Sequence, residues 1–153
     1  MKIKLDFVTN SSSTSFLFVF RGKELEDLYK AMKNMWSIFE LGEGVNVYDL
    51  IDYKEHNRNN QIISIDDKIE EIKKEIKYRQ DFMKINNKHT HEYDNIQKLE
   101  SIIEKLKWLK KKGFKNTVEL WFEDHNTIGS IISYELDDHD SENLTVVKLG
   151  RDG

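Results

Sequence analysis

Residues 16–20 read FLFVF, an uninterrupted run of aromatic and branched apolar residues. Such residues favour β-strands, and a strand without a polar face is typical of one that is covered on both sides. We therefore expect a buried strand at residues 16–20. A helix that spans a bilayer needs roughly 20 apolar residues, so this run is too short to cross a membrane.

A second strand is expected just before this run, at residues 2–9. Apolar and polar side chains alternate there, as they do in a strand with one buried face. The apolar side carries Ile3, Leu5 and Phe7. A polar stretch without glycine or proline lies between the two strands, and we interpret it as a turn or crossover.

The polar stretch is also the first candidate site. Its members are Asn10, Ser11, Ser12, Ser13, Thr14 and Ser15. Their side chains are able to bind an anion or nucleotide, to accept a modifying group such as phosphate, or only to cap the turn, and all three interpretations stay open. The stretch lacks the glycines and the lysine of a P-loop, which counts against a phosphate cradle. No nucleophile-elbow pattern surrounds the serines, so we assign no catalytic residue.

The segment from Lys2 to Phe16, KIKLDFVTNSSSTSF, resembles an N-terminal segment of uncharacterised bacterial and phage proteins, with the form KIxxDFVTNSSSxSF. The resemblance covers about a tenth of the chain. It implies a bacterial or phage origin and no established activity.

After Gly22 the apolar period changes, because apolar residues recur at steps of three and four up to Leu41. This spacing predicts an amphipathic helix over about residues 25–42, closed by Gly42. Residues 43–63 fit either a strand or a short helix, followed by a polar loop.

Two longer helices are expected between residues 64 and 112. Isoleucines step by three and four from Ile65 to Ile76, and apolar residues resume this spacing from Ile96 to Leu106. The polar segment 86–92 interrupts the pattern, so we predict an antiparallel helical hairpin, coiled-coil-like, with arms of about 30 Å. Lysines followed by Gly113 suit the end of its second helix.

Three more strands are expected at residues 117–123, 128–136 and 144–149, joined by acidic turns as an antiparallel meander. The predicted fold is therefore α+β, with a mixed, mainly antiparallel sheet, one packed amphipathic helix and a projecting antiparallel helical hairpin. We expect one domain over residues 1–153, with the hairpin as an insertion at about 64–112.

The amino-acid composition excludes several classes of functional site. The sequence has no cysteine, which excludes disulfides, thiolate zinc sites and iron–sulfur clusters. His89 and His91 supply too few ligands for a metal site, and we interpret the acidic segments 123–125 and 137–140 as solvated turns. We expect no metal, no cofactor and no membrane partner. The lack of cysteine and of a signal-type start fits a cytoplasmic protein.

The net charge of −4 argues against nucleic-acid binding, although its distribution is uneven. Residues 64–112 hold 13 Lys and Arg against 10 Asp and Glu, whereas residues 113–153 hold 3 against 9. The hairpin is mildly basic and the C-terminal part is acidic. Interleaved charges on the hairpin are typical of a solvated helix face.

Our first hypothesis is a non-enzymatic protein-interaction or regulatory protein, such as a phage or mobile-element inhibitor of a host system. It would act through the hairpin and the acidic C-terminal surface. The candidate partner-binding residues are Trp108, Leu109, Asp137, Asp138 and Asp140. A small enzyme or nucleotide-binding protein with a site at the serine-rich stretch is the alternative, and a homodimer through the hairpins is a third hypothesis.

Overall fold

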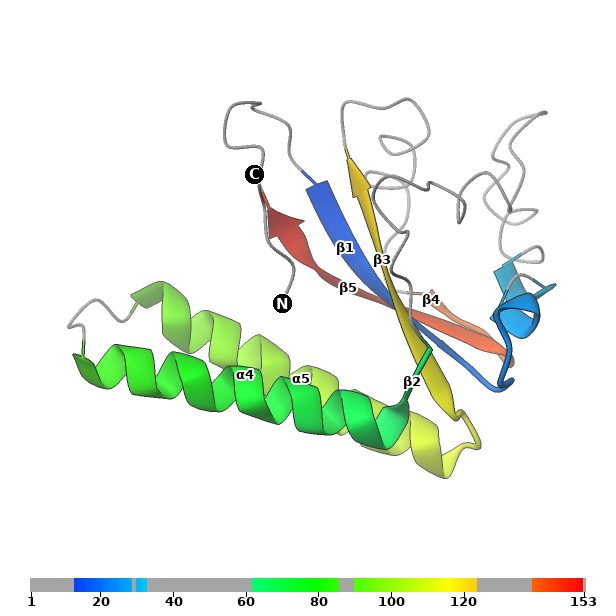
Figure 1. Ribbon diagram of the computed structural model, residues 1–153, viewed down its shortest axis with the longest axis horizontal. Helices are drawn as coiled ribbons and strands as arrows, with labels where there is room; N and C mark the ends of the chain where they lie inside the picture. The colour runs from blue at the N-terminus through cyan, green and yellow to red at the C-terminus, as the bar shows by residue number, and fades with distance from the viewer. Residues whose placement is uncertain (1–12, 29, 33–61, 86–89, 124–138, 153) are drawn as a thin grey trace.

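The computed structural model describes residues 13–28, 30–32, 62–85, 90–123 and 139–152. They form a five-stranded sheet with a two-helix hairpin against one face, as Figure 1 shows, so the α+β prediction is confirmed. The strands are β1 (Ser13–Phe20), β2 (Ile63–Ser64), β3 (Asn116–Glu123), β4 (His139–Asp140) and β5 (Leu144–Asp152). The hairpin consists of α4 (Ile65–Ile85) and α5 (Thr90–Lys111).

The strand order is β2-β3-β1-β5-β4, and every pairing among these strands is antiparallel. The expected buried strand is β1, which lies at the centre. The expected meander is wrong in its order, because β1 lies between β3 and β5. The most apolar strand takes the position in which both of its edges are paired and both of its faces are covered. The expected strands at 2–9 and 128–136 lie outside the described residues.

Alternate residues of β1 face opposite layers. Leu17 lies opposite Glu119 of β3 and Val147 of β5, on the face toward the hairpin. Phe18 lies opposite Val118 and Val146 and belongs to the other face. Residues 16–19 are 0% exposed and Phe20 is 1% exposed, which confirms a strand covered on both sides.

Part of the serine-rich stretch differs from our expectation. Ser13, Thr14 and Ser15 belong to β1 and are paired with both β3 and β5, where we expected a turn or crossover. Ladder hydrogen bonds on two sides outweigh the preference of serine and threonine for turns. Asn10, Ser11 and Ser12 lie outside the described residues.

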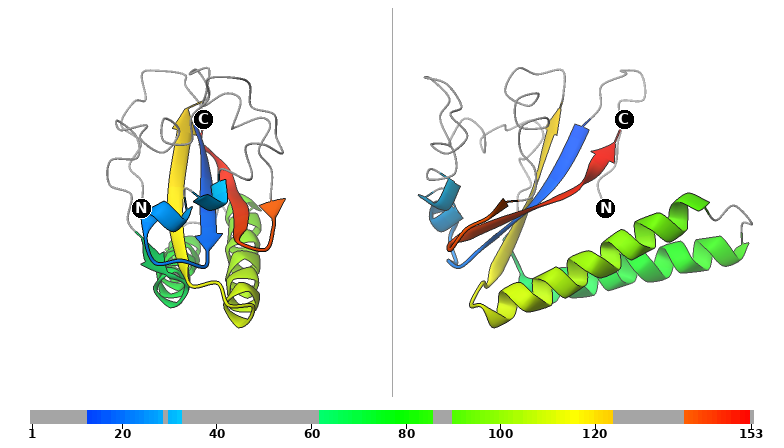
Figure 2. Two further views of the ribbon diagram at one scale, coloured as in Figure 1. Left: turned by 90° about the vertical axis from the view of Figure 1, so that its right-hand side faces the viewer. Right: turned by 180° about the vertical axis from the view of Figure 1, so that it is seen from behind.

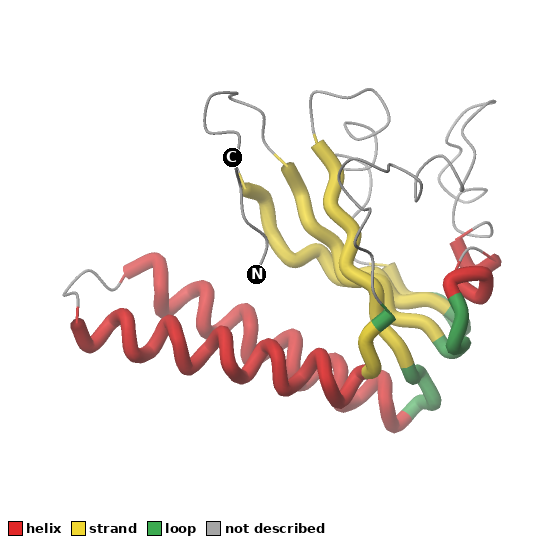
Figure 3. Tube along the Cα trace, viewed as in Figure 1, coloured by secondary structure: helices red, strands yellow, loops and turns green. Residues whose placement is uncertain are grey.

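The hairpin prediction is confirmed, and α5 begins inside the segment where we expected a break, at Thr90. Apolar residues of the two helices and of one face of the sheet form one core cluster, which includes residues 17 and 19 of β1. Figure 3 shows that the hairpin touches the sheet near β2 and diverges from it toward the hairpin tip. The other core residues are Ile65, Ile69, Ile72, Ile102, Ile103, Leu106, Leu109, Phe114 and Val147.

Gly113 ends α5 as the sequence predicts. Its φ of 99° lies in the left-handed region. The amide of Gly113 donates to the carbonyl of Lys110, and the amide of Phe114 donates to that of Leu109, which is the Schellman pattern. Phe114 and Leu109 also share the core, so the cap turns the chain from the helix into β3.

The opposite face of the sheet is covered in part by helical residues 25–28 and 30–32. In the left view of Figure 2 these residues lie in front of the strands and the hairpin lies behind the strands. Leu28 and Met32 are fully buried there. The helix expected from residue 25 is confirmed over this length, and residues 33–42 lie outside the described part of the chain.

Candidate interaction surface

Two of the predicted partner-binding residues lie at the surface. Trp108 on α5 is 47% exposed, and Asp140 on β4 is exposed. Leu109 is only 1% exposed and belongs to the core between hairpin and sheet, so its side chain is removed from any partner. The reason is helical geometry, because neighbouring residues point about 100° apart. Asp137 and Asp138 lie outside the described residues.

Lys105 connects the hairpin to the acidic edge of the sheet. Its Nζ lies 3.3 Å from Oδ1 of Asp140, which also accepts a hydrogen bond of 3.2 Å from Thr145 Oγ1. Lys105 and Trp108 are three positions apart on α5 and therefore share a face of that helix. Asp140 therefore contacts the face of α5 that also carries Trp108.

Arg21 fixes the end of α5 against the turn between β4 and β5. Its Nη1 donates to the carbonyl of Lys112 at 2.6 Å, and its Nε donates to the carbonyl of Glu142 at 2.7 Å. The guanidinium also stacks 4.3 Å from the centroid of Phe114. Sequence reasoning missed Arg21, because its two carbonyl partners are 91 and 121 residues away.

The surface around Trp108 is basic. Nζ of Lys112 lies 3.8 Å from the Trp108 ring centroid, in a cation–π contact. Residues 105–115 contain six lysines and no acidic residue. We call the side chains of Lys105, Trp108, Lys111, Lys112 and Asp140 the hairpin-base surface.

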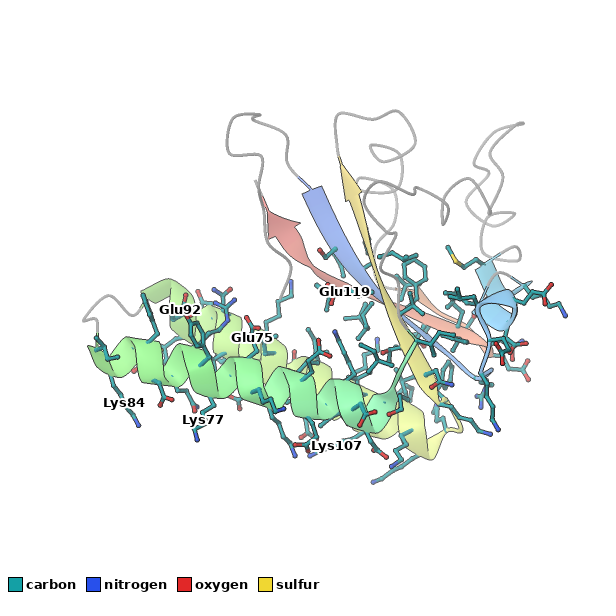
Figure 4. All side chains as sticks on the ribbon, in the orientation of Figure 1. Glu75, Lys77, Lys84, Glu92, Lys107 and Glu119 are labelled. Atoms are coloured by element: carbon teal, nitrogen blue, oxygen red, sulfur yellow. The ribbon has the colours of Figure 1, made fainter. Side chains whose placement is uncertain are left out.

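The hairpin tip carries a second set of exposed apolar side chains. Tyr78 is 67% and Ile85 is 81% exposed, and Phe82 and Tyr93 are also exposed. Arg79 joins the arms there, with Nη1 3.0 Å from Glu92 Oε2 and Nη2 3.1 Å from Glu75 Oε1. Figure 4 shows Glu75 and Glu92 on the side of the hairpin toward the sheet, with Lys77 and Lys84 on the opposite side.

Lys68 is the most deeply buried charged residue among the described residues, with 5% exposure. Burial by itself lowers the pKa of its ammonium group, but Glu119 and Glu71 at 3.1 and 3.2 Å more than offset this, and the pKa lies above its ordinary value. Lys68 therefore stays protonated near neutral pH. A charged, paired lysine of this kind stabilises structure and is not an activated nucleophile.

Two kinds of feature are absent from the described residues. They contain no group of three or more His, Asp or Glu side chains arranged to hold a metal ion. None of the helices in this part of the chain combines the length and the apolar composition that a membrane crossing requires.

Comparisons of the chain with protein-family models, curated proteins and solved structures found no match.

Proposed function

We propose that this protein is a non-enzymatic binding protein that docks on a protein partner through the hairpin-base surface. The observation that carries the proposal is a half-exposed tryptophan, with the ammonium group of Lys112 over its ring, at the junction of hairpin and sheet. Tryptophan is among the residues most often responsible for interface affinity, because it presents a large apolar area and loses little conformational entropy.

The junction supports this role through its rigidity. Leu109, the residue after Trp108, is anchored in the core, and Arg21 holds the carbonyl of Lys112 four residues further along the helix. A preorganised surface loses less entropy on binding than a mobile one. The bound conformation of Trp108 therefore requires little further ordering of the backbone.

The biological role within this proposal is regulation of a host system by a phage or mobile-element protein that acts in the cytoplasm. It is supported by the N-terminal sequence resemblance and by the absence of cysteine.

The experiment compares the proteins that co-purify from the native host with the tagged wild-type chain, with Trp108→Ala and with Tyr78→Ala. Tyr78 provides a matched control, because it is an exposed aromatic residue on the same hairpin but at its tip. We expect a stoichiometric partner that Trp108→Ala loses and Tyr78→Ala keeps. Equal retention by both variants, or no stoichiometric partner of the wild type, would contradict the proposal.

A further inference from the structure

Only some of the lysines at residues 105–115 have a carboxylate partner among the described residues. Lys110 pairs with Asp66 at 2.7 Å and Lys107 with Glu104 at 3.5 Å. No carboxylate of a described residue pairs with Lys111, Lys112 or Lys115. The hairpin base is therefore locally positive in a chain whose net charge is −4.

One carboxylate already binds at the edge of this patch. Asp140 reaches Lys105 from a strand that is 35 residues away in sequence. The contact shows that this face of α5 accepts an acidic side chain from a neighbouring extended segment. Lys111 and Lys112, on the other side of Trp108 along the helix, have no such neighbour among the described residues.

We infer that the partner presents an acidic polypeptide segment in which an apolar side chain packs on Trp108 and flanking carboxylates pair with Lys111 and Lys112. This inference rests on the proposed function and names the chemistry of its partner. Charge complementarity of this kind raises the association rate and rejects basic partners.

The same lysines fit a nucleic-acid strand less well. Proteins that bind single strands stack successive bases on several aromatic side chains along a positive groove. Trp108 is the one exposed large aromatic residue of the described hairpin base, and Asp66, Glu104 and Asp140 interrupt the positive charge around it. A short acidic segment can bind beside Lys111 and Lys112 without approaching these carboxylates, whereas a long polyanion would lie close to them and be repelled.

The test is an NMR titration of the isotope-labelled full chain with a synthetic peptide that has one phenylalanine flanked on both sides by glutamates. The indole N–H signal of Trp108 is assigned by its loss in Trp108→Phe, which separates it from the other two tryptophans. A second peptide replaces each glutamate by glutamine, and a third probe is an oligothymidine strand.

We expect saturable shifts of the Trp108 signal with the glutamate peptide and about tenfold or more weaker binding of the glutamine peptide, as the loss of one or two charge pairs implies. The variant Lys111→Gln/Lys112→Gln should weaken binding similarly. Lys77→Gln/Lys84→Gln, with the same charge change on the outer face of α4 in Figure 4, should leave binding unchanged.

Three results would overturn the inference: no saturable shift, equal binding of the two peptides, or tighter binding of oligothymidine. The co-purification experiment separates this failure from failure of the proposed function. If Trp108→Ala loses the partner but Lys111→Gln/Lys112→Gln keeps it, the docking proposal stands and the inference of an acidic segment fails. If both variants keep the partner, the docking proposal and the inference of an acidic segment both fail.

Discussion

Nζ of Lys68 on α4 lies 3.1 Å from Oε1 of Glu119 on β3, across the interface between hairpin and sheet. Glu119 lies on the sheet face that packs against the hairpin, directly opposite the buried Leu17. Glu71 completes the contact at 3.2 Å from the same ammonium group. A polar link therefore fixes the first turns of α4 to the middle of an otherwise apolar interface.

Replacing Lys68 by alanine should destabilise the protein by about 1–3 kcal/mol, because it removes the buried aliphatic chain and leaves Glu119 without its cation. Glu119 is itself partly exposed, which keeps the loss below that of a fully buried pair. Urea unfolding of the two proteins measures the difference. Lys110→Ala is the control, because its pair with Asp66 is exposed and should be worth about 1 kcal/mol or less.

The same contact predicts a dependence of stability on high pH. The pKa of Lys68 in the folded protein lies above its ordinary value of 10.5. A raised pKa of this kind contributes stability that is complete below the unfolded pKa and is lost as pH rises through the folded pKa. We expect the stability difference between the wild type and Lys68→Met to stay constant from neutral pH to about pH 10 and to shrink above it. A difference that grows at alkaline pH would contradict the pairing.

Gly113→Ala should cost about 1–2 kcal/mol. An L-residue is strained at a φ of 99°, and a Cβ at this position would lie 2.6 Å from Nη1 of Arg21. Gly113→Asn, which tolerates the left-handed region better, should recover part of the backbone loss. Thermal unfolding of the two variants gives the comparison. Equal stability of Gly113→Ala and the wild type would mean that the helix end is not held in this conformation.

Ser64 caps the N-terminus of α4, since its Oγ accepts a hydrogen bond of 3.1 Å from the amide of Asp67. Ser64→Ala should therefore destabilise the protein by about 1 kcal/mol. Ser101→Ala provides the matched control within α5, where the hydroxyl donates only to the carbonyl of Lys98 and alanine has the higher helix propensity. We expect this second variant to match or exceed the wild type in stability.

Alanine substitutions at the adjacent residues Trp108 and Leu109 should separate an effect on partner binding from an effect on folding stability. Leu109→Ala leaves a cavity in the core and should cost about 2–5 kcal/mol, whereas Trp108→Ala should cost about 1 kcal/mol or less. Unfolding curves together with partner binding test the pair. A large loss of stability in Trp108→Ala would show that the ring serves the fold and not the partner.

Local sequence pattern predicted the apolar part of β1, α4 and the end of α5, but not residues 13–15 of β1 or the short strand β4. The FLFVF run predicts β1, isoleucines at steps of three and four predict α4, and Gly113 predicts the end of α5. Each of these signals lies within a few neighbouring residues, where backbone preference and the period of apolar side chains act directly. The strand order escaped prediction, because it depends on which strands bury the edges and faces of β1.

The candidate surface was predictable only in pieces. Trp108 and Asp140 stand out in the sequence as an aromatic residue on a charged helix and an acid in a turn. The contact of Asp140 with the helix that carries Trp108 is made by Lys105, and the sequence does not show it. The burial of Leu109 follows from the direction in which α5 packs on the sheet, and a sequence pattern does not fix that direction.

By itself, the sequence determined the α+β class, the buried strand, the helical hairpin and its glycine end, because these features follow from short-range periodicity and backbone preference. Only the tertiary structure decided that β1 lies between β3 and β5, that Lys68 pairs with Glu119 and that Arg21 clamps the hairpin base. These contacts join segments tens of residues apart, and the chain forms them because packing both faces of β1 brings those segments together.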